Sequence, residues 1–135
     1  MHQRGCVLLS RRSCLMLNDA TCFHTVYIAP GRTDMRRGID GLATIVKQEF
    51  RLDPFQKGTL FLFCGRKTDR IKGLVWEGDG FCLLYKRIEA GRLQWPNTPE
   101  DVLSISKEDF RLLINGFSII QKSTIKEASH YTEIA

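Results

Sequence analysis

A run of six almost wholly apolar residues, Thr59–Cys64, limits the fold of this chain more than any other segment. A strand with one face in water alternates apolar with polar side chains, because successive side chains point to opposite faces. This run has no polar face, as is typical of strands with packing layers on both sides. Thr59–Cys64 is therefore predicted to be a strand covered on both faces.

Short connections link this run to further strands. Residues 71–76 and Phe81–Arg87 flank a tight turn with two glycines, which suits a hairpin. After a second turn, residues 92–95 alternate polar with apolar side chains and end at a proline. Connections this short join antiparallel neighbours. The middle of the chain is predicted to be an antiparallel β-meander, with a first short strand at residues 25–29.

Two helices are predicted from apolar residues at helical spacing. The first is expected to be capped by Thr33 or Asp34. Its apolar face consists of Ile39, Leu42, Ala43, Val46 and Phe50. The second begins with a capping-box-like sequence at Ser106. Its apolar face consists of Phe110, Leu113, Ile114 and Phe117. The predicted fold class is α+β: a single domain in which one or two helices pack on a face of the meander.

The chain is expected to have three parts. Residues 25–118 form the domain, residues 119–135 a flexible C-terminal tail, and residues 1–24 a disordered or spurious N-terminal extension. No stretch approaches the roughly 18 apolar residues of a membrane span. Five cysteines with no C-x-x-C pair predict neither a disulfide framework nor a metal site. Cys64 and Cys82 lie in apolar runs and are interpreted as core residues. The expected location is the cytoplasm.

The charge of the chain is concentrated in its middle. The formal net charge is +5 with a pI near 9.1, and residues 25–96 contain 13 Lys and Arg against 8 Asp and Glu. Such an excess makes nucleic acid the first partner to consider. An ordinary solvated surface is the alternative explanation.

The same region contains an ordered set of short signatures. In chain order they are YIAPGRTDMRRGIDGL at 27–42, LFLFCGR at 60–66, LVWEGDGF at 74–81, LYKR at 84–87 and GRLQWP at 91–96. In this order and spacing the set resembles the second-reading-frame product of the insertion-sequence-66 group, often labelled TnpB. The RNA-guided nuclease that shares this label is a different protein. The resemblance covers residues 25–118 and implies a part in transposition other than cutting DNA.

Nine basic residues are candidates for binding nucleic acid. The first group is placed at the start of the first predicted helix, where backbone N–H groups and arginines favour phosphate. The alternative is that Arg36 or Arg37 pairs with Asp34 or Asp40. A second group occupies the predicted hairpin loop at 65–70, and a third flanks the next turn. The candidates are Arg32, Arg36, Arg37, Arg66, Lys67, Arg70, Lys86, Arg87 and Arg92.

Four aromatic residues could stack on bases, although core packing is the commoner role of aromatic residues in a small sheet. Trp95 is the expected exception to core packing, because it ends a strand beside polar neighbours. The four are Tyr85, Trp76, Trp95 and Phe81.

Catalysis is not expected. Glu77 and Asp79 are close in sequence but lie in a hairpin turn, where Asp is common for backbone reasons. No nucleotide-binding or hydrolase motif occurs in the sequence. The function predicted is a non-catalytic accessory protein of a bacterial insertion sequence, without cofactor or metal. Its expected partners are DNA phosphates, the separate transposase, or both. The alternatives are a module that binds the transposase without touching DNA, and a remnant with no activity.

Overall fold

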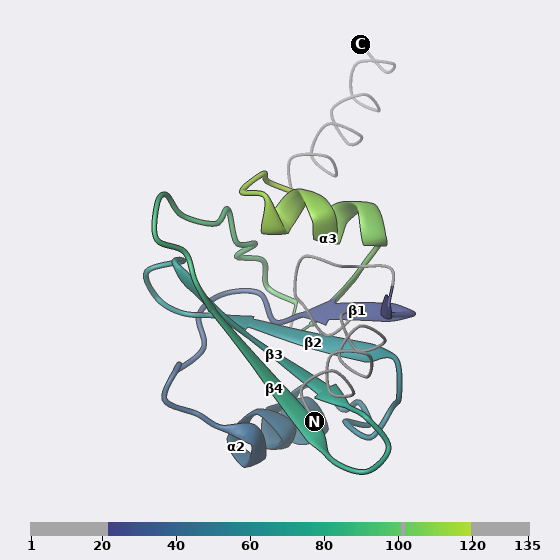
Figure 1. Cartoon of the computed structure of the whole chain (residues 1–135). Helices are drawn as coiled ribbons and strands as arrows, with labels where there is room; N and C mark the ends of the chain where they lie inside the picture. The colour runs from purple at the N-terminus through teal and green to yellow at the C-terminus, as the bar shows by residue number, and fades with distance from the viewer. Residues whose placement is uncertain (1–21, 101, 120–135) are drawn as a thin grey trace, which may run out of the picture.

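The computed structural model describes residues 22–100 and 102–119 and contains one five-stranded sheet. The strands lie in the order β4-β3-β2-β1-β5, and helices cover both faces, with α3 on one side and α2 on the other (Figure 1). In chain order the elements are β1 Thr25–Ile28, α2 Ile39–Thr44, the π-helix η3 Ile45–Glu49, β2 Thr59–Cys64, β3 Arg70–Trp76, β4 Phe81–Arg87, β5 Leu103–Ile105 and α3 Lys107–Ile114. The predicted α+β class is confirmed, except that the helices divide between the two faces instead of sharing one.

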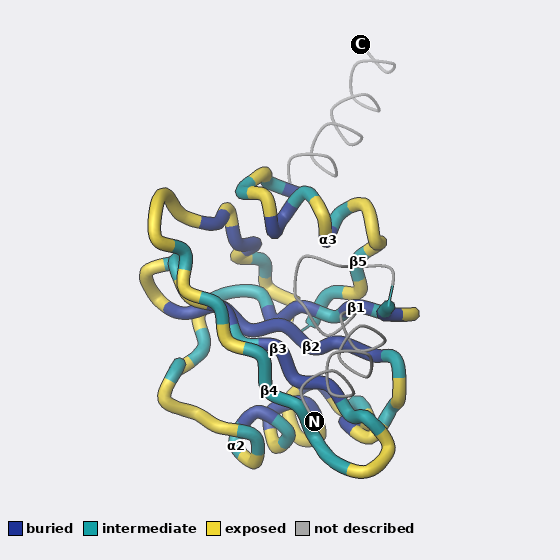
Figure 2. The backbone as a smooth tube through the Cα atoms, in the orientation of Figure 1, coloured by how far each residue is buried: buried dark blue, intermediate teal, exposed yellow. Residues whose placement is uncertain are grey.

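β2 is the central strand, and all six of its residues are buried (Figure 2). Leu60, Leu62 and Cys64 face the core under α3. Phe61 and Phe63 face the second core, under α2 and η3. Burial raises the pKa of the Cys64 thiol to about 12, which keeps it a neutral core group. The prediction of a strand covered on both faces is confirmed.

Two pairings of the sheet differ from a simple meander. β2–β3 and β3–β4 are antiparallel hairpins as predicted, but β1 runs parallel to β2. A parallel neighbour needs a crossover, and α2 with η3 supplies it between β1 and β2. The fifth strand is β5, which pairs antiparallel with β1.

The predicted strand at residues 92–95 is wrong. Leu93 and Trp95 are buried, so the alternation of polar and apolar residues does correspond to alternate burial. However, the Leu93 backbone N–H donates to Thr68 O in a loop, the Trp95 indole N–H donates to Ala29 O, and residues 92–95 belong to no strand of the sheet. Buried donors need a partner, and here loops provide it.

The first helix begins later than predicted. Neither Thr33 nor Asp34 caps it, because Thr33 N donates to Cys64 O and the Asp34 carboxylate accepts from Arg36. The helix starts at Ile39 after Gly38, which makes no side-chain cap. Its predicted face is otherwise correct, because Leu42, Ile45, Val46 and Phe50 are buried and Ile39 and Ala43 pack partly against them.

The second helix matches its prediction at the start and differs at the end. The Ser106 hydroxyl accepts from Asp109 N at 3.0 Å, as a cap should. Phe110, Leu113 and Ile114 are buried. Phe117 is 59% exposed, because the helix ends before it.

The two ends of the chain are described only in part. Phe23 is buried in the core and His24 N donates to Gly58 O, so both pack beside β1. The predictions for residues 1–21 and 120–135 lie outside the described residues.

Truncating a buried aromatic side chain of β2 should strongly destabilise the fold. Phe63→Ala removes a fully buried ring that stacks with Phe50 at 6.0 Å. We expect the free energy of unfolding in urea to fall by about 3–5 kcal/mol. Phe117→Ala is the matched control, because its ring is exposed, and should change stability by less than about 0.5 kcal/mol. Equal losses in the two variants would contradict the assigned core.

Candidate functional site

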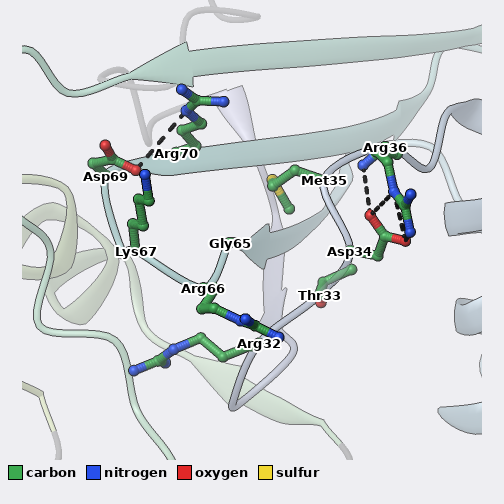
Figure 3. A pocket seen from close by; sticks show the side chains of 10 residues that line it. All are labelled: Arg32, Thr33, Asp34, Met35, Arg36, Gly65, Arg66, Lys67, Asp69 and Arg70. Atoms are coloured by element: carbon green, nitrogen blue, oxygen red, sulfur yellow. Dashed lines mark hydrogen bonds and ion pairs between the residues drawn. The ribbon is translucent and has the colours of Figure 1, made fainter.

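An open cleft of about 500 Å³ brings together two basic segments that lie far apart in the sequence (Figure 3). One wall is the segment after β1, and the other is the loop between β2 and β3. We call this hollow the arginine cleft. Its lining residues are Arg32, Thr33, Asp34, Met35, Arg36, Gly65, Arg66, Lys67, Asp69 and Arg70. Five of the nine predicted basic residues therefore share one site.

The first wall is positioned by the parallel pairing of β1 with β2. Beyond the end of β1, Ala29 N donates to Leu62 O at 2.9 Å and Thr33 N donates to Cys64 O at 2.8 Å. The chain thus stays beside β2 as far as Thr33. Arg32 is exposed between these two bonds, at the carboxyl end of the central strands.

The second wall is a tight hairpin loop at the end of β2. Gly65 N donates to Arg70 O at 3.0 Å, and Thr68 N donates to Gly65 O at 3.1 Å. Thr68 takes a left-handed backbone conformation, with a φ of 57°. Arg66 and Lys67 are exposed at the tip of this loop.

The Met35 side chain closes on Gly65 and joins the two walls. A Cβ placed on Gly65 would lie 2.7 Å from Met35 Cγ, which is closer than such atoms approach. A larger residue at this position would therefore have to displace the Met35 side chain, although the φ of Gly65 is not left-handed. Figure 3 shows Met35 between the two segments.

Residues 93–96, which we call the bridging segment, form hydrogen bonds with the backbone of both walls. Leu93 N donates to Thr68 O at 2.8 Å in the second wall. The buried Trp95 indole Nε1 donates to Ala29 O at 2.8 Å, at the start of the first wall. Gly31 N donates to Pro96 O at 2.8 Å. The expectation that Trp95 is exposed for stacking is wrong, because its ring is core and its N–H fixes the backbone.

Two carboxylates lie in the cleft, and each is next to an arginine. Arg36 Nη2 lies 2.9 Å from Asp34 Oδ2, and Arg36 Nε donates to Asp34 Oδ1 at 3.0 Å. The pairing alternative for Arg36 is thus the arrangement observed. These hydrogen bonds from Arg36 lower the pKa of Asp34 from 3.8 to about 2. Arg70 Nε lies 3.9 Å from Asp69 Oδ1, a looser pair.

The remaining candidates lie outside the cleft lining. Arg37 is exposed, and its carbonyl accepts from Lys72 Nζ at 2.9 Å. Arg87 donates to Glu89 at 2.8 Å. Lys86 alternates with Arg87 along β4 and so points to the opposite face of the sheet. Arg92 is exposed directly before the bridging segment.

Lys72 lies just beyond the predicted loop at 65–70 and is not among the nine predicted residues. It lies on β3 opposite Tyr85 of β4, and its Nζ is 5.7 Å from the centre of the Tyr85 ring. The signal was present in the alternation of β3, since residues two apart share a face of a strand. Arg70 and Lys72 are such a pair.

Other kinds of site are not found in the part of the chain that the structure describes. Within residues 22–100 and 102–119, no group of His, Cys, Asp or Glu side chains could hold a metal ion. Within the same residues, no helix is long and apolar enough to cross a membrane.

The Asp34–Arg36 pair makes a direct pH prediction. A carboxylate whose pKa is lowered in the folded state stabilises the fold above its unfolded pKa, and this contribution is lost as the pH falls from 3.8 through about 2. In a carbon-detected NMR titration, the Asp34 carboxyl should remain mostly ionised at pH 3. Arg36→Gln should return its midpoint toward 3.8. A midpoint near 3.8 in the unsubstituted protein would contradict the pairing.

Comparison with known proteins agrees with the resemblance seen in the sequence. The family described as IS66 Orf2 like protein matches residues 24–124. Uncharacterized protein y4hO of Sinorhizobium fredii is 38% identical over 91 residues, which cover 67% of this chain and 78% of the relative. Uncharacterized protein y4jC of the same organism is 33% identical over 91 residues, which cover 67% and 77%. No solved structure matches the chain. The chain belongs to the IS66 Orf2-like family of transposition-associated proteins.

Proposed function

We propose that this protein assists transposition as a non-catalytic accessory factor that docks the arginine cleft on DNA phosphates. One observation carries the proposal: the cleft is lined by five cationic side chains and only two carboxylates. Because Asp34 is paired with Arg36 and Asp69 lies 3.9 Å from Arg70, three cations of the cleft lining remain in excess. Those three are Arg32, Arg66 and Lys67.

The side chains of the cleft suit a phosphate backbone. Arginine presents several N–H donors in one plane and can bind two phosphate oxygens at once. Arg32 and Arg66 extend from opposite walls (Figure 3). A phosphate between the walls would receive donors from both sides. Contacts of this kind fix position along a nucleic acid and carry no base sequence information.

The backbone of the cleft is ordered before any ligand arrives. The bridging segment bonds to both walls through Leu93, Trp95 and Pro96. Binding to a preformed site loses less conformational entropy than binding to a mobile loop. This order supports a role for the cleft beyond that of a solvated turn.

A second candidate function is a module that binds the transposase and leaves DNA untouched. Phe117 favours it, because this large apolar side chain is 59% exposed after the end of α3. The first turn of α3, at the opposite end of the helix from Phe117, is acidic, so α3 also offers a surface whose charge differs from that of the cleft. Exposed aromatic residues are common in protein interfaces.

A salt series separates the two candidates. Binding of the full chain to a random-sequence duplex should weaken steeply between about 50 and 200 mM salt. The double variant Arg66→Ala/Lys67→Ala should bind more weakly, and its log–log salt slope should be smaller by about 1.8 if both side chains neutralise a phosphate. The melting temperature should hardly change, because both side chains are exposed.

The matched control is Lys107→Ala/Arg111→Ala, which removes the same charge from α3, outside the cleft lining. This control should keep the affinity and salt slope of the unsubstituted protein. Equal effects of the two double variants, or no salt-dependent binding at all, would contradict docking through the cleft. Loss of transposase binding in Phe117→Ala, with DNA binding absent, would favour the second candidate.

A further inference from the structure

Three large apolar or aromatic side chains are exposed in the described residues: Phe55, Tyr85 and Phe117. The Phe55 ring packs edge-on against Trp76, with ring centroids 4.9 Å apart, and its centroid lies 5.1 Å from that of Phe81. Phe55 therefore belongs to an aromatic cluster. Tyr85 differs because it lies opposite a cation, Lys72, on the neighbouring strand. Its ring is 52% exposed on β4.

The ammonium group of Lys72 lies over the Tyr85 ring. The Lys72 Nζ is 5.7 Å from the ring centre and donates to Arg37 O at 2.9 Å. The cation is therefore held in place by the backbone that precedes α2. Among the described residues β4 is an edge strand, so the side of Tyr85 away from β3 has no neighbouring strand. The ring leaves room there for another flat group.

A row of cations connects Tyr85 with the arginine cleft. Arg70 of β3 lines the cleft and lies directly opposite Arg87 of β4 in the strand register. Lys72 pairs with Tyr85 one step further along the same face. Residues two apart on a strand are about 7 Å apart, which one extended nucleotide can bridge. A nucleic-acid strand with a phosphate beside Arg70 can therefore bring its next base to the Tyr85 ring.

We infer that Tyr85 is a base-stacking position beside the arginine cleft, and that the protein therefore binds unpaired nucleotides in preference to duplex. The inference rests on the proposed function. A tyrosine ring stacks on any base with little sequence preference when the base face is free, as in single strands. In a duplex both faces of each base are covered by neighbouring bases. Phosphate contacts in the cleft serve either form of nucleic acid.

The test compares two probes on the full chain: a labelled oligothymidylate, which has no stable secondary structure, and a labelled random duplex. Tyr85→Ala should weaken binding of the oligothymidylate by at least about fivefold and leave duplex binding unchanged. Tyr85→Phe keeps the ring and should keep the affinity. Tyr85→Leu keeps apolar bulk without a ring, so it should lose affinity as Tyr85→Ala does. Phe117→Ala is the control for loss of an exposed ring elsewhere.

Each outcome has a separate meaning. If Arg66→Ala/Lys67→Ala weakens both probes and no Tyr85 variant weakens either, the stacking inference fails and the proposed function stands. If Tyr85→Ala and Tyr85→Leu weaken both probes equally, Tyr85 is no stacking position and the preference for unpaired nucleotides fails. If neither probe binds the unsubstituted protein, the proposed function and the inference fail together, and a protein partner remains.

Discussion

The burial of β2 on both faces is the constraint on which the rest of the structure depends. Its side chains alternate between two cores, one closed by α3 and the other by α2 and η3. Because β1 runs parallel to β2, the carboxyl ends of the two strands meet at one edge of the sheet. The arginine cleft lies at this edge, since its walls are the segments that leave β1 and β2. In open sheets with parallel strands, this edge is a common place for ligand sites.

The bridging segment explains how exposed arginines come to have an ordered backbone. Residues 93–96 bury Leu93 and Trp95 in the core and use their N–H groups to bond both walls. Removing a buried donor leaves the carbonyl of Ala29 without its partner, at a cost of about 1–3 kcal/mol. The core and the cleft are thus coupled through the bridging segment, in which Trp95 both packs in the core and bonds to Ala29. Conditions that loosen the packing around Trp95 should also loosen the cleft.

Much of the fold could be predicted from the sequence, because its signals are local. Burial of β2, the two hairpins, the Ser106 cap and the apolar faces of both helices follow from period and turn chemistry over a few residues. The prediction of a loop is also correct for Arg66 and Lys67, whereas Arg70 is the first residue of β3. The parallel β1–β2 pairing and the role of residues 92–95 were not predictable in this way.

Those features depend on contacts between distant segments. Alternation of Leu93 and Trp95 indicates alternate burial, but it does not say whether a ladder or loops accept the hydrogen bonds. The shared cleft likewise arises only when the segment after β1 meets the loop after β2. The first helix begins later than predicted because the Asp34 carboxylate accepts hydrogen bonds from Arg36 and does not cap the helix. Capping and this local bond compete for the same carboxylate, and the capping propensity of Asp does not show which one forms.

The most direct test of the central claim is an NMR map of the amides that respond to a short oligothymidylate. If the two walls form one phosphate site, the amides of residues 32–36 and 65–70 should shift together with a single affinity, and those of α3 should stay unchanged. Shifts confined to α3, or different affinities for the two walls, would contradict the account.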